Sequence, residues 1–310
     1  MPAGCLHSPA RLCLLKARHI IVVGFSFLAL VGAATAAVPA AAGVAQTSLA
    51  YPVGEQFTFT ATAVGFLPIG TVWMEVTTGS FEQTPTFVFN GRCFGDFKLY
   101  LADVRVSSHL SARTDQSLFH CIEQFGSERR GRRLMFDWQS NLVRYVRLER
   151  DNVTYKLRRE VPVSPDVLDV FGCAFRTRRL FRSFATNSAV EIKVIETERV
   201  FHLRAIVADR KPLTVPGIGT FDAARIRFEA LNLKSNEVFK GLLDLDKDIQ
   251  IWVDTSTCTP LYMCSKVPFG IVRPTVEVTL KEWKTVPGFE PVLLKTNTFL
   301  PRAFAAPRQE

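Results

Sequence analysis

The stretch Phe57-Thr58-Phe59-Thr60-Ala61-Thr62-Ala63 decides the fold class of this chain, because apolar and polar side chains alternate through it without a break. Successive side chains of a β-strand point to opposite faces, so this stretch has one apolar and one polar face. The same alternation recurs at residues 72–76, 201–207, 226–230 and 276–280. One buried and one solvated face are typical of antiparallel sheets. The sequence therefore predicts an all-β protein built on an antiparallel curved sheet or half-open barrel.

One segment departs from this alternation. Ser164-Pro165-Asp166 supplies a hydroxyl cap, a proline for the first helical position and an acid for the first turn. Apolar residues then follow at intervals of three and four: Val167, Val170, Phe171, Ala174 and Phe175. This spacing predicts one short helix that begins at Ser164 and packs its Phe side chains onto the sheet.

The N-terminal segment has the features of an export signal. An uncharged apolar run at residues 20–31 follows three basic residues and precedes Ala34-Thr35-Ala36. We expect a signal peptide at 1–36, a small-residue linker at 37–48, a single β-rich domain at 49–286 and a C-terminal tail at 287–310. The mature protein is then exported and periplasmic. Because no charge occurs from residue 20 to residue 45, an uncleaved membrane anchor is the alternative.

The chain is basic, and its excess of cations is local. It has 38 Lys and Arg against 29 Asp and Glu, a net charge of +9. Residues 126–182 hold thirteen Arg and one Lys against seven acids. A basic surface attracts anionic lipids or glycans, although a solvated face is the simpler interpretation. The candidate patch, expected to be solvent-facing, comprises Arg129, Arg130, Arg132, Arg133, Arg176, Arg178, Arg179 and Arg182.

Five cysteines lie beyond the predicted signal peptide. Cys258 and Cys264 are on one predicted strand, where six residues at about 3.3 Å each separate them by roughly 20 Å. A disulfide needs Cα atoms within about 7 Å, so we expect no bond between them. Cys93 and Cys121, on strands expected to be neighbours, are the better candidates for a disulfide.

Several local patterns resemble binding or catalytic motifs but lack an essential part. Residues 244–248 resemble the start of a calcium loop, but Ile249 and Thr255 stand where a glycine and an acid are needed. The stretch Pro216-Gly217-Ile218-Gly219-Thr220 precedes a strand rather than a helix, so it predicts a turn rather than a phosphate site. No nucleophile elbow, P-loop or metalloprotease motif occurs. We therefore expect no cofactor, no metal site and no enzyme activity.

A predicted hairpin turn near residues 113–116 leaves the relation of two histidines open. In one register His109 and His120 face each other and could hold a transition metal. Residues 253–260 form a turn of similar length, and alignment with that turn shifts the register and separates the two histidines. We expect a hairpin pair without a metal.

Several turn motifs occur in a recognisable order. They are Tyr51-Pro52-Val53-Gly54-Glu55, Pro68-Ile69-Gly70, Gly217-Ile218-Gly219-Thr220-Phe221-Asp222, the hairpin at 251–260 and Val267-Pro268-Phe269-Gly270. In this order they resemble the bacterial exported family known as domain of unknown function 3108, from about residue 49 to residue 283. The resemblance implies a signal peptide, an envelope location and an all-β fold, and it implies no activity.

The functional hypothesis is an uncharacterised, non-catalytic envelope protein that binds an anionic amphiphile or an envelope partner. Its 25 phenylalanines could line a site for an acyl chain, with the basic segment at the headgroup. One alternative is a structural or assembly factor that pairs with another protein through sheet edges. Another is an enzyme with an unrecognised site. The expected partners are an anionic lipid, a glycan or another envelope protein, and not a nucleic acid.

We predict that export removes the N-terminal segment by cleavage between Ala36 and Gln46, because small residues fill that stretch. N-terminal sequencing of the protein from the envelope fraction measures the cleavage site. Recovery of intact Met1 in the membrane pellet would instead identify the apolar run as an anchor.

Overall fold

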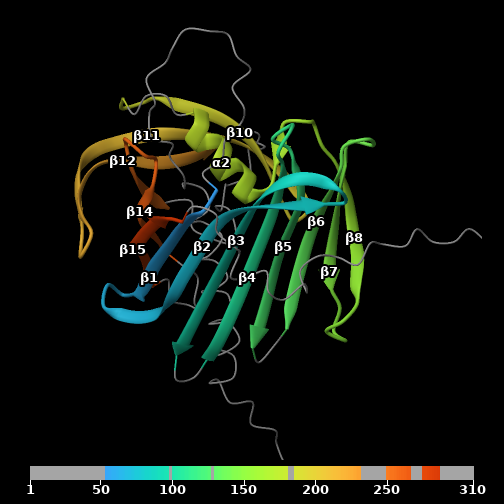
Figure 1. The fold of residues 1–310 in the computed structure, drawn as a ribbon, viewed down its shortest axis with the longest axis horizontal. Helices are drawn as coiled ribbons and strands as arrows, with labels where there is room; N and C mark the ends of the chain where they lie inside the picture. Colours follow the sequence, from blue (N-terminus) through green and yellow to red (C-terminus); the bar gives the residue numbers. More distant parts are fainter. Residues whose placement is uncertain are drawn as a thin grey trace, which may run out of the picture.

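The described strands form a single sheet of fifteen strands, in the order β8-β7-β6-β5-β4-β3-β2-β1-β15-β14-β13-β12-β11-β10-β9 (Figure 1). The computed structural model describes residues 53–97, 100–126, 129–180, 185–231, 249–266 and 274–286. The strands are β1 Glu55–Ala63, β2 Leu67–Phe81, β3 Thr84–Phe97, β4 Tyr100–Ser111, β5 Ser117–Gly126, β6 Arg130–Asp137, β7 Leu142–Leu148, β8 Tyr155–Pro162, β9 Val167–Leu168, β10 Ala189–Glu196, β11 Arg199–Val215, β12 Gly219–Ala230, β13 Gln250–Asp254, β14 Pro260–Lys266 and β15 Thr275–Thr285. The one described helix, α2, is Val170–Leu180.

The sheet is curved, antiparallel and open, which confirms the predicted fold class. Every neighbouring pair is antiparallel except β9 and β10, which are parallel. Strands β8 and β9 are the two edges and do not pair with each other, so the sheet does not close into a barrel. Strand β1 pairs with both β2 and β15, and thereby joins the N-terminal and C-terminal halves of the sheet.

The alternating stretch that predicted the fold lies on β1 and faces the core as expected. Phe57 and Phe59 are buried, whereas Thr58 and Thr60 are more exposed or face the other side of the sheet. Apolar residues from β1–β4 and β10–β15 continue this concave face into one core. Helix α2 packs on the same face, with the Phe171 ring stacked on Phe89 of β3 at 4.3 Å between centroids. The predicted helix–sheet contact through phenylalanine is therefore present.

The helix begins later than the sequence predicted. Residues 167–168 form strand β9, and the first helical residue is Val170 rather than a residue next to Ser164. Asp169 caps the helix, since its Oδ1 accepts hydrogen bonds from the backbone N–H of Phe171 and Gly172 at 2.8 and 3.1 Å. The spacing of three and four matches the helix from Val170 onward, but parallel pairing of Val167 with β10 overrides it before that point.

The two turns of similar length have the same backbone conformation. In one, Ser111 N donates to Gln116 O at 2.8 Å, and Asp115 has φ of 62°. In the other, Asp254 N donates to Thr259 O at 2.9 Å, and Cys258 has φ of 53°. As predicted, the Asp254 side chain accepts a backbone hydrogen bond within its turn, from Thr257 N at 2.9 Å. Residues 216–218 also form the predicted turn, between β11 and β12.

The predicted disulfide between Cys93 and Cys121 is wrong. All five described cysteines are free thiols. Cys93 lies on β3 in the concave core, whereas Cys121 lies on β5 and packs with Phe81 and Phe119. Strand β4 separates the two strands, so the residues are not cross-strand neighbours. The expectation that Cys258 and Cys264 do not pair is confirmed.

The hairpin register separates the two histidines. His109 pairs with Phe119, and His120 pairs with Ser108, so the two imidazoles point to opposite faces of the sheet. The predicted signal peptide, the linker, the calcium-like stretch at 244–248 and the C-terminal tail lie outside the described residues.

Candidate functional site

A buried carboxylate holds α2 on the sheet. Asp169 is fully buried. Its two oxygens accept hydrogen bonds from Ser108 Oγ of β4 at 2.8 Å and Ser117 Oγ of β5 at 2.5 Å, besides the two helix amides. Asp169 N also donates to Ser117 Oγ at 2.9 Å. A buried carboxylate is tolerated only when its acceptor sites are satisfied, and here four donors satisfy them.

The same cluster contains Ser, His and Asp but lacks the order of a catalytic triad. His120 Nδ1 lies 3.6 Å from Asp169 Oδ1, and both serine hydroxyls donate to the carboxylate rather than to the imidazole. A triad needs the serine bonded to the histidine, which in turn is oriented by the acid. The geometry is therefore that of a helix cap bonded to two strands.

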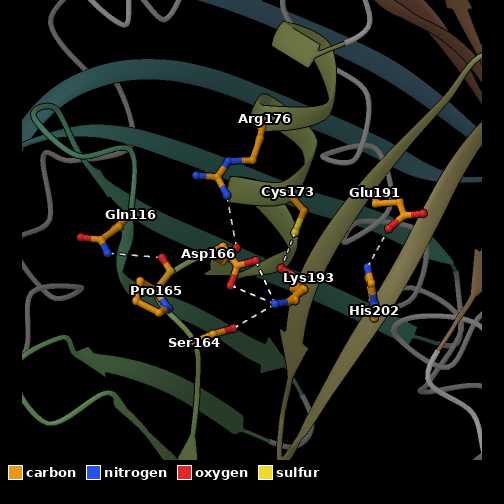
Figure 2. Close-up of polar contacts among 9 residues, drawn as sticks. All are labelled: Gln116, Ser164, Pro165, Asp166, Cys173, Arg176, Glu191, Lys193 and His202. Carbon is orange, nitrogen blue, oxygen red and sulfur yellow. Dashed lines mark hydrogen bonds and ion pairs between the residues drawn. The ribbon is translucent and has the colours of Figure 1, made fainter.

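The segment before the helix is held by a second set of polar contacts (Figure 2). Lys193 Nζ of β10 lies 3.0 Å from Asp166 Oδ2, and Arg176 Nη1 donates to Asp166 O at 3.2 Å. Gln116 Nε2 donates to Pro165 O at 3.3 Å. Ser164-Pro165-Asp166, read from the sequence as a helix start, is instead a linker attached to β10, α2 and the β4–β5 turn.

The predicted patch is divided between the two faces of the sheet. Arg132 lines a small pocket beside Val170 of the helix, which places it on the concave face. Arg133, the next residue, lies on the convex face, where its Nη2 contacts Glu123 Oε1 at 2.8 Å and its guanidinium stacks on Tyr155 at 3.6 Å. The expectation that the whole cluster is solvent-facing is wrong for Arg133, because strand alternation turns it into a nearly buried ion pair.

Of the remaining predicted arginines, three have described side chains, and their surroundings differ. Arg129 is exposed, with its guanidinium 5.3 Å from the centroid of the Phe125 ring, and Arg130 is half-buried. Arg176 lies 3.8 Å from Asp115 Oδ2, so its charge already has a carboxylate partner. Arg178 and Arg179 belong to α2 by their backbone, and Arg182 lies outside the described residues.

A row of three cations crosses β6, β7 and β8. Arg132 pairs with Arg147, and Arg147 pairs with Lys156, so the three side chains share the concave face. Within the described part of the chain, no carboxylate lies within ion-pair distance of any of them. Like charges placed directly opposite each other destabilise a sheet, so an anion at this row would relieve a repulsion. We call these residues the cation row.

Sequence reasoning found Arg132 but missed Arg147 and Lys156. The three residues are far apart in the chain, and only the hairpin registers align them. The available signal was the alternation of β7 and β8, but it does not specify which residues lie opposite each other.

The small pocket next to the row has room for about one water molecule. Its lining includes His120, Arg132, Tyr145 and Thr197. His120 Nδ1 is buried without a hydrogen-bond partner, so a bridging water fits the polarity of this position. Among the residues that the structure describes, no cluster of His, Cys, Asp and Glu is arranged to hold a metal ion.

The fold and these residues define an all-β protein with one open sheet, one helix capped on its concave face, and a cation row beside that helix. Comparison with protein families gives the family. The family described as "Protein of unknown function (DUF3108)" matches residues 58–277, which is more than half of the chain. The chain therefore belongs to the domain of unknown function 3108 family, as the turn motifs indicated. A comparison with curated proteins found no match. None of the described helices is long and apolar enough to span a membrane.

We predict that Arg133→Met lowers the free energy of unfolding by about 3 kcal/mol, because it leaves the buried Glu123 carboxylate without its cation. Chemical denaturation measures this change. Arg129→Ser is the matched control, since Arg129 is exposed, and its effect should stay within about 0.5 kcal/mol. Equal effects of the two substitutions would show that the Glu123–Arg133 pair does not stabilise the fold.

We predict that buried histidines destabilise the protein in mild acid. Burial lowers the pKa of His109 to about 4, and it also lowers the pKa of His120. The unfolded chain binds these protons near pH 6.5. The contribution of the neutral histidines to the free energy of unfolding is therefore full above that pH and is lost as the pH falls toward 4. The expected loss is roughly 3 kcal/mol for His109.

The measurement is the difference between the unfolding free energies of wild type and His109→Leu from pH 7 to pH 4. A difference is needed because burial raises the pKa of Glu75 to about 7, which has the opposite effect on stability between pH 4.5 and 7. Val153→Ser, at a valine that is 78% exposed, is the control: it removes no titrating group and should keep the wild-type profile. A His109→Leu profile parallel to that of wild type would contradict the prediction.

Proposed function

We propose that this chain is an exported, non-catalytic protein of the cell envelope that binds an anionic amphiphile. The observation that carries the proposal is the cation row: three cations aligned across three strands, with no carboxylate partner among the described residues. Export rests on the N-terminal sequence and remains a prediction. The ligand would place its anionic group at Arg132, Arg147 and Lys156.

The surroundings of the row favour an amphiphile over a simple anion. Along the same cross-strand line, Arg132 pairs with Ile122 of β5, which belongs to the apolar core of the concave face. The line therefore passes from apolar to cationic within one strand spacing, which is about 4.8 Å. Sites for small molecules are mainly apolar with a few polar groups that orient the ligand, and this arrangement fits that description.

The β6–β8 hairpins also carry a local excess of positive charge. Residues 129–162 contain ten Lys and Arg against four Asp and Glu. Several of these cations are neutralised on the sheet, as Arg144 is by Glu160 at 3.1 Å. Among the described residues, no carboxylate neutralises the cation row in this way. The field of this part of the sheet thus supports attraction of anions, and the row supplies the contact.

Two alternatives have less support. Pairing through a sheet edge needs a flat, apolar, unprotected strand, but edge strand β8 is mostly exposed and carries Lys156, Arg158, Arg159 and Glu160. An enzyme needs converging catalytic groups, and the Ser-His-Asp cluster is arranged as a helix cap. The absence of catalysis is thus part of the proposal, and activity screening of the mature protein would test it.

We predict that the mature protein binds monomeric lysophosphatidic acid and does not bind lysophosphatidylcholine. Arg147→Ser should weaken this binding about fivefold, since each cation near an anionic group contributes about 1 kcal/mol. Equilibrium dialysis below the micelle concentration gives both affinities. Arg144→Ser is the matched control on the same strand, because Arg144 pairs with Glu160.

Glycerol phosphate distinguishes an amphiphile site from an anion site. Affinity for lysophosphatidic acid far above that for glycerol phosphate supports the apolar part of the proposal. Equal binding of the anionic and zwitterionic lipids, or equal loss in the two arginine variants, would overturn the assignment of the cation row.

A further inference from the structure

The β1–β2 turn exposes apolar side chains that the core does not use. Phe66 is 78% exposed, Val64 is 58% exposed and the adjoining Leu67 is 38% exposed. The backbone of the turn is nevertheless held, because Val64 N donates to Thr275 O of β15 at 2.9 Å and Phe66 N donates to Ala63 O at 3.3 Å. Neighbouring apolar side chains on a fixed turn mark an interaction site more strongly than scattered ones do.

The conformation of Val64 strengthens this observation. Its φ is 55°, in the left-handed region, where a β-branched residue is strained and Gly or Asn is favoured. Exposed apolar surface also contributes nothing to folding at this position. The Val64 side chain packs into no described core cluster although its backbone is strained, so we expect the role of this side chain to lie in an interaction.

The topology places this turn at the same end of the strands as the turns after β5 and β7. Strands β1 to β8 are consecutive antiparallel neighbours, so the turns after β1, β5 and β7 lie at the same end of the strands. In Figure 1 the β1–β2 and β7–β8 turns both lie toward the bottom of the view, whereas α2 lies toward the top. The exposed Arg129 follows β5. The β7–β8 turn carries the 78% exposed Val153, and the charge of its Arg150 is offset by Glu149 and Asp151.

We propose that this end of the sheet docks on an anionic lipid bilayer, with Phe66 and Val64 inserted among the headgroups and acyl chains and with Arg129, Arg147 and Lys156 at the lipid phosphates. The combination of apolar tips and flanking cations is complementary to an anionic membrane surface, whose headgroups are charged and whose interior is apolar. Arg147 and Lys156 of the cation row lie close to this end of the sheet, because they are near the end of β7 and the start of β8. The docking proposal rests on the proposed function, because it names a bilayer as the source of the anionic amphiphile.

The test is co-sedimentation of the mature protein with vesicles of phosphatidylglycerol and phosphatidylcholine, compared with phosphatidylcholine alone. Phe66→Ser should lower partitioning to the anionic vesicles about tenfold, since it removes the largest apolar insertion. Val64→Asn should also lower partitioning, yet raise the thermal stability, because Asn tolerates the left-handed conformation. Val53→Ser is the matched control, at an exposed valine before the other end of β1.

A second measurement locates the inserted residue. Phe66→Trp should be quenched by brominated phosphatidylglycerol vesicles beyond the quenching of the wild-type tryptophans. Vesicle binding that is unchanged in Phe66→Ser and Val64→Asn would overturn the docking proposal. Loss of self-association in Phe66→Ser, without any vesicle binding, would overturn it in favour of contact with a second copy. Binding of monomeric lysophosphatidic acid without vesicle binding would overturn the docking proposal alone, whereas loss of both would overturn the proposed function as well.

Discussion

The attachment of α2 to the sheet depends on one buried carboxylate, Asp169. Its oxygens join the first turn of the helix to hydroxyls on β4 and β5, so a single side chain fixes the position of the helix on the concave face. A buried charge is costly unless its hydrogen bonds are complete, and removal of a donor would leave that cost uncompensated. The stack of Phe171 on Phe89 adds apolar contact, but it does not by itself select this position.

Strand alternation has a direct consequence for the charges of the chain. Four arginines within five residues resemble one basic patch, yet adjacent residues of a strand face opposite sides of the sheet. Arg132 thus lies beside the helix, and Arg133 lies in the convex network of Glu123 and Tyr155. A charge count along the sequence overestimates the cations available to a partner. Among the described residues, the cations of the row have no carboxylate partner, and they come from three strands.

Much of the architecture could be predicted, because its signals are local. Alternation on β1 implied a one-sided antiparallel sheet, and Gly217 and Asp254 marked turns that the structure contains. The failures concern contacts between distant segments. The helix start at Ser164 was overridden by pairing of Val167 with β10, and the Cys93–Cys121 disulfide assumed that β3 and β5 are neighbours. Of the proposed binding residues, only Arg132 was named from sequence.

The sequence by itself determined the period of the strands, the apolar face of β1, the apolar face of the helix and the location of the positive charge, since each depends on residues close together in the chain. The tertiary structure decided which cations align, which carboxylates neutralise them and which apolar side chains remain exposed. Those outcomes depend on strand register, and a shift of one residue would exchange the two faces. Register is set by pairing between strands, and no single segment encodes it.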